Sequence, residues 1–351
     1  MLRILALLAL IPAAALRAEV MAVPAPGPHE AELVIYSSLD ARLARPLIEG
    51  FQTENPGIAV RYEDLLANEI RERIVAESDA GGTTADFAFS SGMDLQMKLA
   101  NDGYARPVSL PAAAHWPDWA NWRETAFALT FEPGVLIYHR PSFPEGPPQS
   151  RLALMRWLKQ AGPAVQGRVG TYDITRSAVG YLFVAQDDEH FSDIWAVLQA
   201  MGAAGLQTFP TSQDIIDRVA DGRLLIGYNI LGSYAADQAR LHPDLGYVLL
   251  RDYTVVVSRV ALVPRAAARP DLGERFLGFL LSRSGQEILA RKLRLPAVSL
   301  EVSDANSARS MQAALGDQLR PVNVSPGLLV YLDQAKRRRL IRRWHEALNS
   351  R

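Results

Sequence analysis

The hydrophobic and polar positions of residues 32–64 follow the pattern of one strand–helix–strand unit. An apolar, β-branched run at 33–36 is typical of a buried strand. The apolar positions that follow recur at helical spacing: Leu43, Leu47, Ile48 and Phe51. Pro56 and Gly57 end that helix, and a second strand is predicted over 58–63. Such a unit implies a parallel sheet, a right-handed crossover and a ligand-binding loop at the end of the first strand.

Polar loops follow two of the predicted parallel strands. The first strand ends at Ser37, Ser38 and Asp40, and a strand over 85–89 ends at Ser90 and Ser91. Hydroxyls and free backbone N–H groups at strand ends and helix starts form a donor-rich cradle that suits an anion. The alternative is helix capping, which serine performs in many proteins. Because both pairs end strands of one sheet, we favour ligand binding.

Proline positions set further expectations for the fold. Pro46 falls inside the first predicted helix, so that helix begins near Arg45 or is kinked in its first turn. Pro133 and Gly134 predict a turn between strands at 126–132 and 135–139, and the prolines at 141–148 mark a domain boundary. Residues 254–263 predict one long strand. Residues 327–348 predict a basic amphipathic helix, which we interpret as a solvated surface, with a partner or phospholipid contact as the alternative.

The second half of the chain repeats the arrangement of strand ends and polar loops. A strand at 168–172 opens into a helix, and a strand at 224–228 opens into the next helix. The candidate residues at these two strand ends are Tyr172, Thr175, Arg176, Ser177, Asn229, Ser233 and Tyr234. Tyr253 comes just before the long strand, where it either faces a ligand or packs at a hinge.

The composition narrows the class of protein. The formal net charge is −1, which gives no bias toward nucleic acid or a membrane surface. There is no cysteine, which excludes disulfides, thiolate metal sites and a lipidated N-terminal cysteine. Residues 1–18 have an early arginine, an apolar core shorter than the ~20 residues needed to span a bilayer, and small residues at the end. We interpret them as a signal peptide, with an uncleaved anchor as the alternative.

The common catalytic patterns are absent from the sequence. The histidines form no His-x-x-x-His pair, and there is neither a P-loop nor a Gly-x-Ser-x-Gly motif. The acidic runs at 63–64 and 187–189 are interpreted as surface turns. An exported α/β protein of this kind is expected to bind a solute and not to be an enzyme. An exported enzyme on the same scaffold is the alternative.

Blocks spread over about residues 32–300 resemble periplasmic solute-binding proteins of ABC transporters, in the ferric-ion and phosphosugar-binding branch. They are ELVIYSSLD, PLIEGFQTENPGIAVRYED, ADFAFSSGMD, RVGTYDITRSAVGY, IIDRVADGRLLIGYNILGSY and SRVALVPRAAARPDLGERFLGFLLSRSGQEILA. The resemblance implies a type 2 periplasmic-binding fold of two α/β lobes, each a mixed, mostly parallel sheet, joined by two hinge strands around a cleft. It divides the chain into lobe 1 at 30–135, lobe 2 at 136–253, and a return to lobe 1 with C-terminal helices at 254–351.

The iron ligands of the ferric-binding members are not kept in this sequence. Asp40 takes the place of their His, Ser91 that of their Glu, and Leu231 and Gly232 those of their Tyr pair. Fe³⁺ needs anionic oxygen ligands, so we expect no metal or other cofactor. Tyr228 and Tyr234 flank the site and keep a ferric-binding protein open as an alternative.

The replacement by hydroxyl groups indicates a small organic anion, either a phosphorylated sugar or a carboxylate. Arg176 and Arg259 are the candidate counter-charges, because a guanidinium binds such groups with two parallel hydrogen bonds. The predicted ligand-binding residues are Ser37, Ser38, Asp40, Ser90, Ser91, Tyr172, Thr175, Arg176, Ser177, Asn229, Ser233, Tyr234, Tyr253 and Arg259. The expected partner of this periplasmic monomer is an ABC permease or, alternatively, a membrane sensor kinase.

Overall fold

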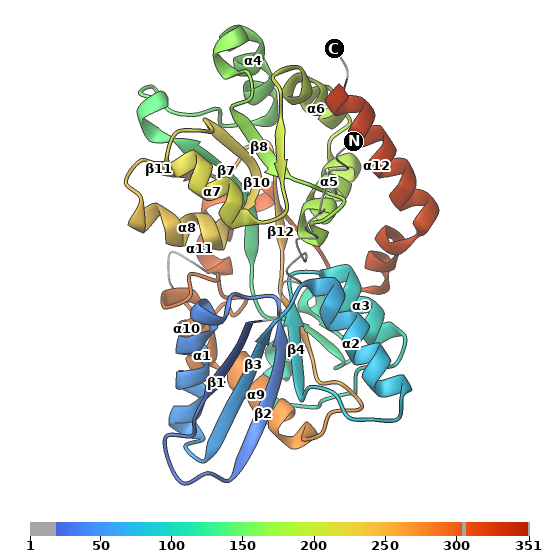
Figure 1. The fold of residues 1–351 in the computed structure, drawn as a ribbon. Coiled ribbons are helices and arrows are strands. Elements are labelled where there is room, and N and C mark those ends of the chain that lie inside the picture. Colours follow the sequence, from blue (N-terminus) through green and yellow to red (C-terminus); the bar gives the residue numbers. More distant parts are fainter. Residues whose placement is uncertain (1–18, 304–306, 350–351) are drawn as a thin grey trace, which may run out of the picture.

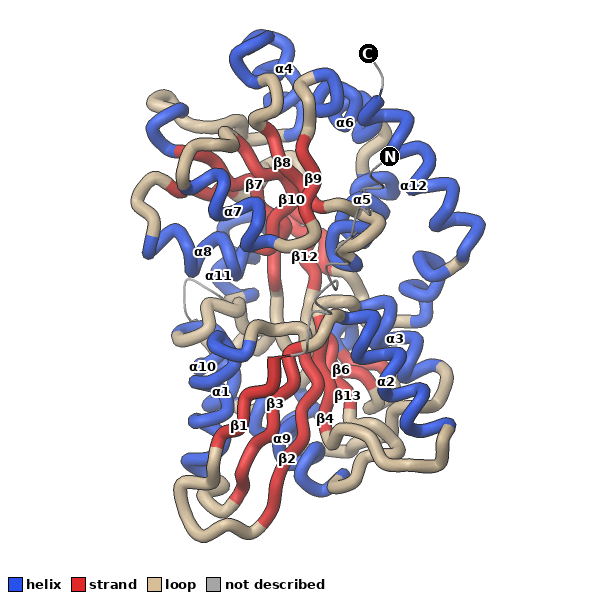
Figure 2. Tube along the Cα trace, viewed as in Figure 1, coloured by secondary structure: helices blue, strands red, loops and turns tan. Residues whose placement is uncertain are grey.

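The computed structural model describes residues 19–303 and 307–349, and the chain forms two lobes that each contain one β-sheet (Figures 1 and 2). The predicted signal peptide, residues 1–18, lies outside the described residues. Across the described ranges, no helix is long and apolar enough to cross a membrane. The two-lobed α/β architecture is the one expected from the sequence.

Lobe 1 is built on a seven-stranded sheet of order β1-β3-β2-β4-β13-β6-β5. Its strands are β1 (Glu19–Val23), β2 (Ala31–Ser37), β3 (Ile58–Asp64), β4 (Phe87–Ser90), β5 (Asn121–Trp122), β6 (Ala126–Ala128) and β13 (Val260–Leu262). β2 pairs in parallel with both β3 and β4, whereas β1 and β13 join antiparallel. The sheet is therefore mixed, and its parallel part is limited to the three central strands that end at the cleft.

Helices cover both faces of this sheet and bury their apolar sides against it. They are α1 (Ala41–Glu54), α2 (Ala67–Asp79), α3 (Met93–Asn101), α9 (Pro270–Leu281) and α10 (Arg283–Arg291), with 3₁₀ turns at Pro111–His115 and Asp118–Ala120. α1 runs from Ala41 with Pro46 inside it, so the expected start near Arg45 is wrong. Burial of Leu47 and Phe51 offsets the one backbone hydrogen bond that Pro46 cannot donate.

Lobe 2 contains a second sheet of order β14-β12-β7-β10-β8-β9, with β11 also paired to β7. Its strands are β7 (Glu132–His139), β8 (Val169–Tyr172), β9 (Gln207–Phe209), β10 (Ile226–Leu231), β11 (Leu245–Val248), β12 (Thr254–Val257) and β14 (Leu319–Pro321). β8 pairs in parallel with β9 and β10, and β7 is antiparallel to its neighbours.

The remaining helices belong to lobe 2 or to the C-terminal segment. They are α4 (Arg151–Ala161), α5 (Ala178–His190), α6 (Ile194–Ala203), α7 (Ser212–Ala220), α8 (Gly232–Leu241), α11 (Ala308–Leu315) and α12 (Gln334–Asn349), with 3₁₀ segments at Arg140–Ser142, Gly162–Val165, Gly316–Gln318 and Pro326–Leu332. The expected single C-terminal helix over 327–348 is wrong in its first part, because Pro326–Leu332 is a 3₁₀ segment.

The chain crosses between the lobes from β6 to β7, from β12 to β13, and a third time between β13 and β14. The predicted turn at Pro133 and Gly134 is wrong, because β7 runs straight through both residues. A Cβ at Gly134 would lie 2.7 Å from the ring of Phe183, so this glycine permits close packing instead of a turn. The long strand expected at 254–263 is divided at Ser258 and Arg259, where the backbone leaves one sheet for the other.

These crossings differ from the division expected from the sequence. The first crossing precedes Glu132 and not the prolines at 141–148. β12 and β14 lie in the lobe 2 sheet, and α12 packs on α6 through the buried Trp344. Much of the C-terminal part that was expected to return to lobe 1 therefore packs on lobe 2.

Candidate functional site

A cavity of about 330 Å³ lies between the lobes and is lined by both of them. On the side of lobe 1 it is bounded by the loops after β2, β3 and β4. On the side of lobe 2 it is bounded by the first residues of α5, α7 and α8. The carboxyl ends of parallel strands and the helices that follow them thus meet here, as in other open α/β sheets that bind ligands.

Each serine pair of lobe 1 contributes one lining residue and one buried support. Ser38 and Ser91 line the cavity. Ser37 is buried and its Oγ accepts the Leu39 N–H at 3.1 Å, which is a capping role. Ser90 is also buried, and its Oγ lies 3.0 Å from that of Ser38. One serine of each pair therefore has a supporting role inside the protein, and the other lines the cavity, where ligand contact stays a prediction.

Two carboxylates line the lobe 1 wall. Asp40 is exposed at the start of α1, and Asp64 follows at the end of β3. Asp64 accepts the Ala41 N–H at 3.2 Å, so it caps the helix that Asp40 precedes. Burial and then the neighbouring Asp40 charge raise the pKa of Asp64 to about 6. The interpretation of Asp64 as part of a surface turn was wrong, although its place at the end of a strand parallel to β2 was a usable signal.

The floor of the cavity contains a buried ion pair where the first two crossings meet. Arg259 is 1% exposed, and its Nε lies 3.1 Å from a carboxylate oxygen of Glu132, which is fully buried. Glu132 also accepts hydrogen bonds from the hydroxyls of Thr130 and Ser233. Arg259 Nη1 donates to the Ser38 carbonyl at 3.3 Å. The positive charge of Arg259 is thus neutralised within the protein, by a glutamate that the sequence interpretation missed.

Tyr234 connects the two walls. It projects from the first turn of α8 in lobe 2, and Asp40 of lobe 1 is near enough for its charge to raise the pKa of the Tyr234 hydroxyl. The Arg259 guanidinium lies 5.9 Å from the centre of its ring. Burial is the largest cause that raises the pKa of the Tyr234 hydroxyl above its usual range, so the phenol stays protonated.

The lobe 2 wall is made by helix N-termini and one arginine. Ser177 caps α5 and Thr211 caps α7, and each side-chain oxygen accepts an N–H from the first turn of its own helix. The N–H groups of the first two residues of a helix have no intrahelical acceptor, and in α5 and α7 these residues line the cavity. Arg176 is exposed and lines the cavity, and it forms no ion pair with any residue in the described ranges.

Tyr172 supports this wall from beneath. It is buried, its hydroxyl lies 2.6 Å from that of Ser212, and it accepts the Leu231 N–H at 3.2 Å. Pro210, Thr211, Ser212 and Gln213 all line the cavity. Sequence reasoning recognised Thr211 and Ser212 only as a cap, because β9 is too short to predict the third parallel strand of this wall.

Besides the buried Ser37 and Ser90, four more predicted site residues do not line the cavity. Ser233 is buried against Glu132, and Thr175 is exposed and donates to its neighbour Asp173 at 2.6 Å. Asn229 and Tyr253 both donate to Asp187, at 2.7 and 2.6 Å. These two belong to a polar network inside lobe 2.

Asp187 is the centre of that buried network. It is fully buried on α5, accepts from Arg151 at 3.0 Å and accepts the Tyr228 hydroxyl at 2.8 Å. The interpretation of 187–189 as a surface turn was therefore wrong for Asp187, because three neutral donors and one arginine compensate its burial. Tyr228, which kept the ferric alternative open, is held in this network and not in the cleft.

Comparisons with known proteins agree with the two-lobed geometry. A family described as bacterial extracellular solute-binding protein matches residues 33–292. The crystal structure of the substrate binding protein of the ABC transporter from Agrobacterium tumefaciens is 60% identical, with a TM-score of 0.90 over 95% of this chain and 99% of that chain. No curated protein sequence matches the chain.

Two more distant structures share the fold. The periplasmic binding protein AfuA from Actinobacillus pleuropneumoniae, with exogenous fructose-6-phosphate bound, has a TM-score of 0.72 at 16% identity over 91% of this chain and 99% of that chain. Iron-bound HitA from Pseudomonas aeruginosa has a TM-score of 0.68 at 16% identity over the same shares. One structure thus holds a sugar phosphate and the other iron, so the fold alone does not choose between the two ligands.

Proposed function

Since the chain belongs to the family of bacterial extracellular solute-binding proteins, we propose that its lobes close around a hydroxylated organic anion such as a sugar phosphate. It acts as the substrate-binding component of an ABC transporter. Outside the cytoplasmic membrane it binds this ligand and delivers it to the permease in that membrane. The ligand lies in the cavity between the lobes, and lobe closure is the hinge motion common to such proteins.

The observation that carries the proposal is the lobe 2 wall. Arg176 has no ion-pair partner among the described residues, and it stands beside the open N-termini of α5 and α7. Backbone N–H groups and the positive end of a helix dipole both favour an anion, and an arginine fork binds phosphate with two hydrogen bonds. An anionic group is therefore best placed against lobe 2.

The lobe 1 wall supports the other half of the ligand. Asp40 and Asp64 are hydrogen-bond acceptors there, and Ser38 and Ser91 add hydroxyls. Carboxylates beside an anion would repel it, but they accept hydrogen bonds from sugar hydroxyls well. A ligand with hydroxyls at one end and a phosphate at the other matches both walls, and a simple dicarboxylate matches only one.

The ferric alternative has weaker support. The cavity offers Asp40, Asp64 and Tyr234, but burial raises the pKa of Tyr234 and so disfavours the phenolate that a ferric ion would bind. In the described part of the chain, no group of three or more His, Asp or Glu side chains is placed to hold a metal ion. A sensor-kinase partner would use the same ligand and stays a prediction.

A ligand panel tests the proposal on protein that has been unfolded, stripped of ligand and refolded. We expect a hexose 6-phosphate to raise the melting temperature, because a ligand at a hundredfold excess over Kd adds about 2.7 kcal/mol of stability. The parent hexose, inorganic phosphate and succinate are the controls and are expected to give smaller shifts. Stabilisation by ferric citrate with a visible tyrosinate absorption band would contradict the proposal.

A further inference from the structure

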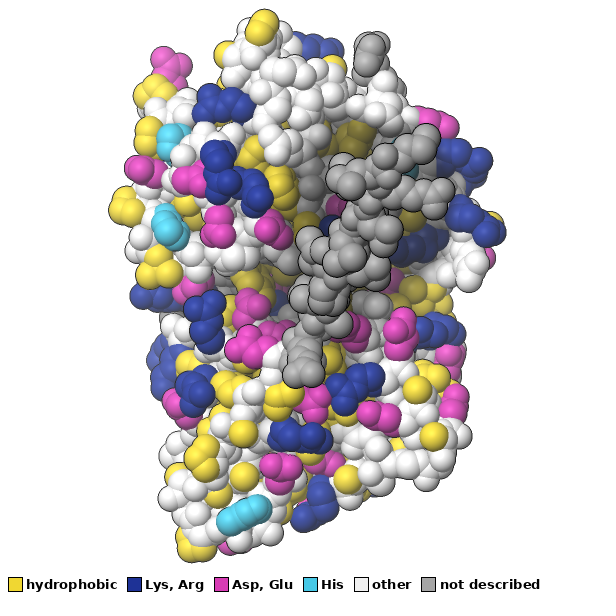
Figure 3. Space-filling view, viewed as in Figure 1, with side chains coloured by type: hydrophobic (Ala, Val, Ile, Leu, Met, Phe, Trp, Pro, Cys, Tyr) yellow, Lys and Arg dark blue, Asp and Glu magenta, His cyan; other side chains and the backbone are white. Residues whose placement is uncertain are grey.

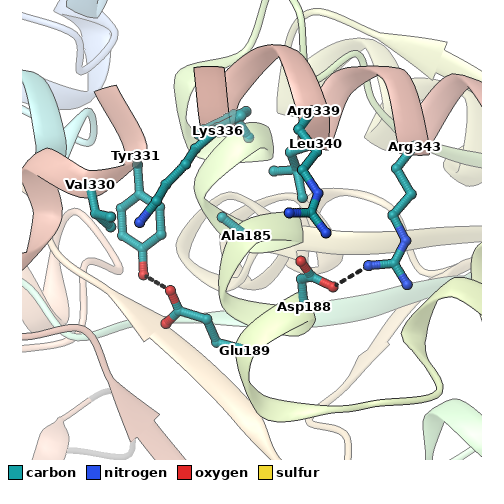
Figure 4. Close-up of a pocket in the computed structure, with 10 residues that line it drawn as sticks. Ala185, Asp188, Glu189, Val330, Tyr331, Lys336, Arg339, Leu340 and Arg343 are labelled. Atoms are coloured by element: carbon teal, nitrogen blue, oxygen red, sulfur yellow. Dashed lines mark hydrogen bonds and ion pairs between the residues drawn. The ribbon is translucent and has the colours of Figure 1, made fainter. Parts of the chain in front are cut away.

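A second cavity, of about 300 Å³, lies between α5 and the C-terminal segment (Figure 4). Its walls are one face of α5, the end of the 3₁₀ segment Pro326–Leu332, and one face of α12. It shares no lining residue with the cleft between the lobes. Because it is separate from the proposed ligand site, its chemistry needs its own explanation.

The α12 face of this cavity is cationic. Lys336, Arg339 and Arg343 reach from α12 toward α5 (Figure 4). Arg343 is paired with Asp188 at 3.2 Å, but Lys336 and Arg339 have no ion pair with any residue of the described ranges. Positive charges three and four positions apart on a helix repel each other. Such a face is costly next to another helix unless something negative lies between them.

The opposite side of the cavity does not supply enough negative charge. Asp188 pairs with Arg343, and Glu189, which accepts a hydrogen bond from the neutral Tyr331 hydroxyl at 2.8 Å, leaves one carboxylate for the two cations Lys336 and Arg339. Two helices that pack directly use an apolar stripe, yet here the facing positions include only Ala185 and Leu340 as apolar helix residues. The two helix faces therefore enclose a space of mixed character, with apolar and aromatic walls and with two cations that form no ion pair in the described part of the chain.

The remaining cations of α12 are arranged differently. Arg337 lies over the Tyr181 ring at 4.4 Å, and the buried Asp94 of α3 is close enough to feel its charge. Arg338 and Arg342 lie on another face of the helix, away from α5. Figure 3 shows basic side chains along the right-hand edge of the molecule, where Figure 1 places α12. The inward pair Lys336 and Arg339 is thus distinct from the outward pair on the same helix.

We propose that this cavity binds a small, multiply charged anion, a phosphate ester or a polycarboxylate, with Lys336 and Arg339 as its charged ligands. The rings of Tyr181 and Tyr331 form the side walls against which the carbon part of the anion packs. The 3₁₀ segment that supplies Tyr331 also packs on α3 of lobe 1, so the occupied site joins elements of both lobes.

A tryptophan next to the cavity reports on its occupation. Trp195 Nε1 donates to Asp188 at 2.5 Å, and the Arg343 guanidinium lies 4.1 Å from the centre of the indole ring. Both of these partners line the cavity. An anion that draws Arg343 or repels Asp188 changes the surroundings of the indole and hence its fluorescence.

The test uses the Arg176→Ala protein, because this substitution weakens anion binding in the cleft. Citrate and, separately, inorganic phosphate are titrated into it at low salt. We expect a saturable change in tryptophan fluorescence that Trp195→Phe removes, with binding by calorimetry retained in that variant. Adding Lys336→Ala and Arg339→Ala should weaken binding at least about tenfold, since charged hydrogen bonds are lost. Arg338→Ala with Arg342→Ala is the matched control, because it removes the same charge from the same helix.

The outcomes separate this site from the cleft. The proposal is supported if Lys336→Ala with Arg339→Ala loses anion binding and Arg338→Ala with Arg342→Ala retains it. Equal weakening in both variants, or no saturable binding in any protein, overturns it. With an intact cleft, Lys336→Ala with Arg339→Ala should keep any stabilisation by hexose 6-phosphate. Loss of that stabilisation in this variant would show that the cavity is not an independent site.

Discussion

The floor of the cleft and its lobe 2 wall each present one arginine, and the two arginines differ in what surrounds them. Arg259 on the floor is buried, and its Nε lies 3.1 Å from a carboxylate oxygen of Glu132 where the first two chain crossings meet. Arg176 on the wall is exposed and has no ion pair among the described residues. The charge of Arg259 is thus used to join the lobes, and that of Arg176 is available to a ligand.

The two arginines contribute unequally to the positive potential of the cleft. A buried ion pair contributes little net attraction for a third charge, because its field is largely cancelled by its own partner. The positive potential of the cleft therefore comes from one wall, while the opposite wall has Asp40 and Asp64. Arg259 is best described as a positioning residue that holds the Ser38 loop and the crossings together.

The largest expected effect follows from removing the partner on the floor. Glu132→Gln leaves Arg259 buried without a counter-charge, which should lower the free energy of unfolding by about 3–5 kcal/mol. Urea denaturation followed by circular dichroism measures this loss. Glu274→Gln breaks the exposed pair between Arg106 and Glu274 at 3.2 Å, and it is expected to cost less than about 1 kcal/mol. Equal losses in the two variants would contradict the role assigned to the floor.

The next largest effect concerns the wall. Arg176→Ala should weaken binding of a sugar phosphate by about 10- to 100-fold, because hydrogen bonds to charged groups contribute about 1.5–3 kcal/mol. Its melting temperature without ligand should stay unchanged, since the side chain is exposed. Calorimetric titration measures the affinity. The affinity of Arg176→Lys should lie between those of the wild type and Arg176→Ala, because lysine keeps the charge without the two parallel hydrogen bonds of a guanidinium.

The affinity of Arg176→Ala decides which of the two arginines binds the ligand. The control is Arg240→Ala, which removes a charge from α8 of the same lobe outside the cavity lining and should leave affinity unchanged. If Arg176→Ala binds as tightly as the wild type, the anion lies elsewhere and Arg259 would have to be reconsidered as its ligand.

Most of the fold was predictable because it depends on local patterns. Apolar runs and helical spacing located the strands and helices of the unit at 32–64, and its two strand ends do reach the cavity. The errors fell where one residue type serves different tertiary purposes. Gly134 permits a close approach of Phe183 instead of a turn. The burial of Asp187 is compensated by hydrogen-bond donors that lie far from it in the sequence.

The site was less predictable for the same reason. The sequence offered Arg176 and Arg259 as equal candidates, since nothing local shows that Glu132 will meet one of them across a chain crossing. Asn229 was expected just after a strand at 224–228 but lies inside β10, and its side chain, like that of Tyr253, donates to Asp187. Side-chain direction and long-range pairing are set by packing between elements, which no single stretch of sequence contains.

The smallest expected effect tests the lobe 1 wall through pH. Burial and the nearby Asp40 charge raise the pKa of Asp64 to about 6 from its ordinary value of 3.8. The folded protein therefore binds this proton more tightly than the unfolded chain, so the stability contributed by Asp64 is present below pH 4 and is lost as the pH rises through 6. Asp64→Asn cannot ionise and still offers an oxygen to the Ala41 N–H. Its melting temperature should match the wild type at pH 4 and exceed it by about 1–3 °C at pH 7.5.

The control for this prediction has the opposite sign. A hydrogen bond from Arg223 holds the pKa of Asp221 below its ordinary value, so Asp221→Asn should be slightly less stable than the wild type at pH 7.5. Differential scanning calorimetry at both pH values measures the two differences side by side. If the melting temperature of Asp64→Asn does not exceed that of the wild type at pH 7.5, the ionised Asp64 carboxylate of the wild type is not destabilised by burial or by Asp40. The contrast between an acidic lobe 1 wall and a basic lobe 2 wall would then be weaker than the geometry indicates.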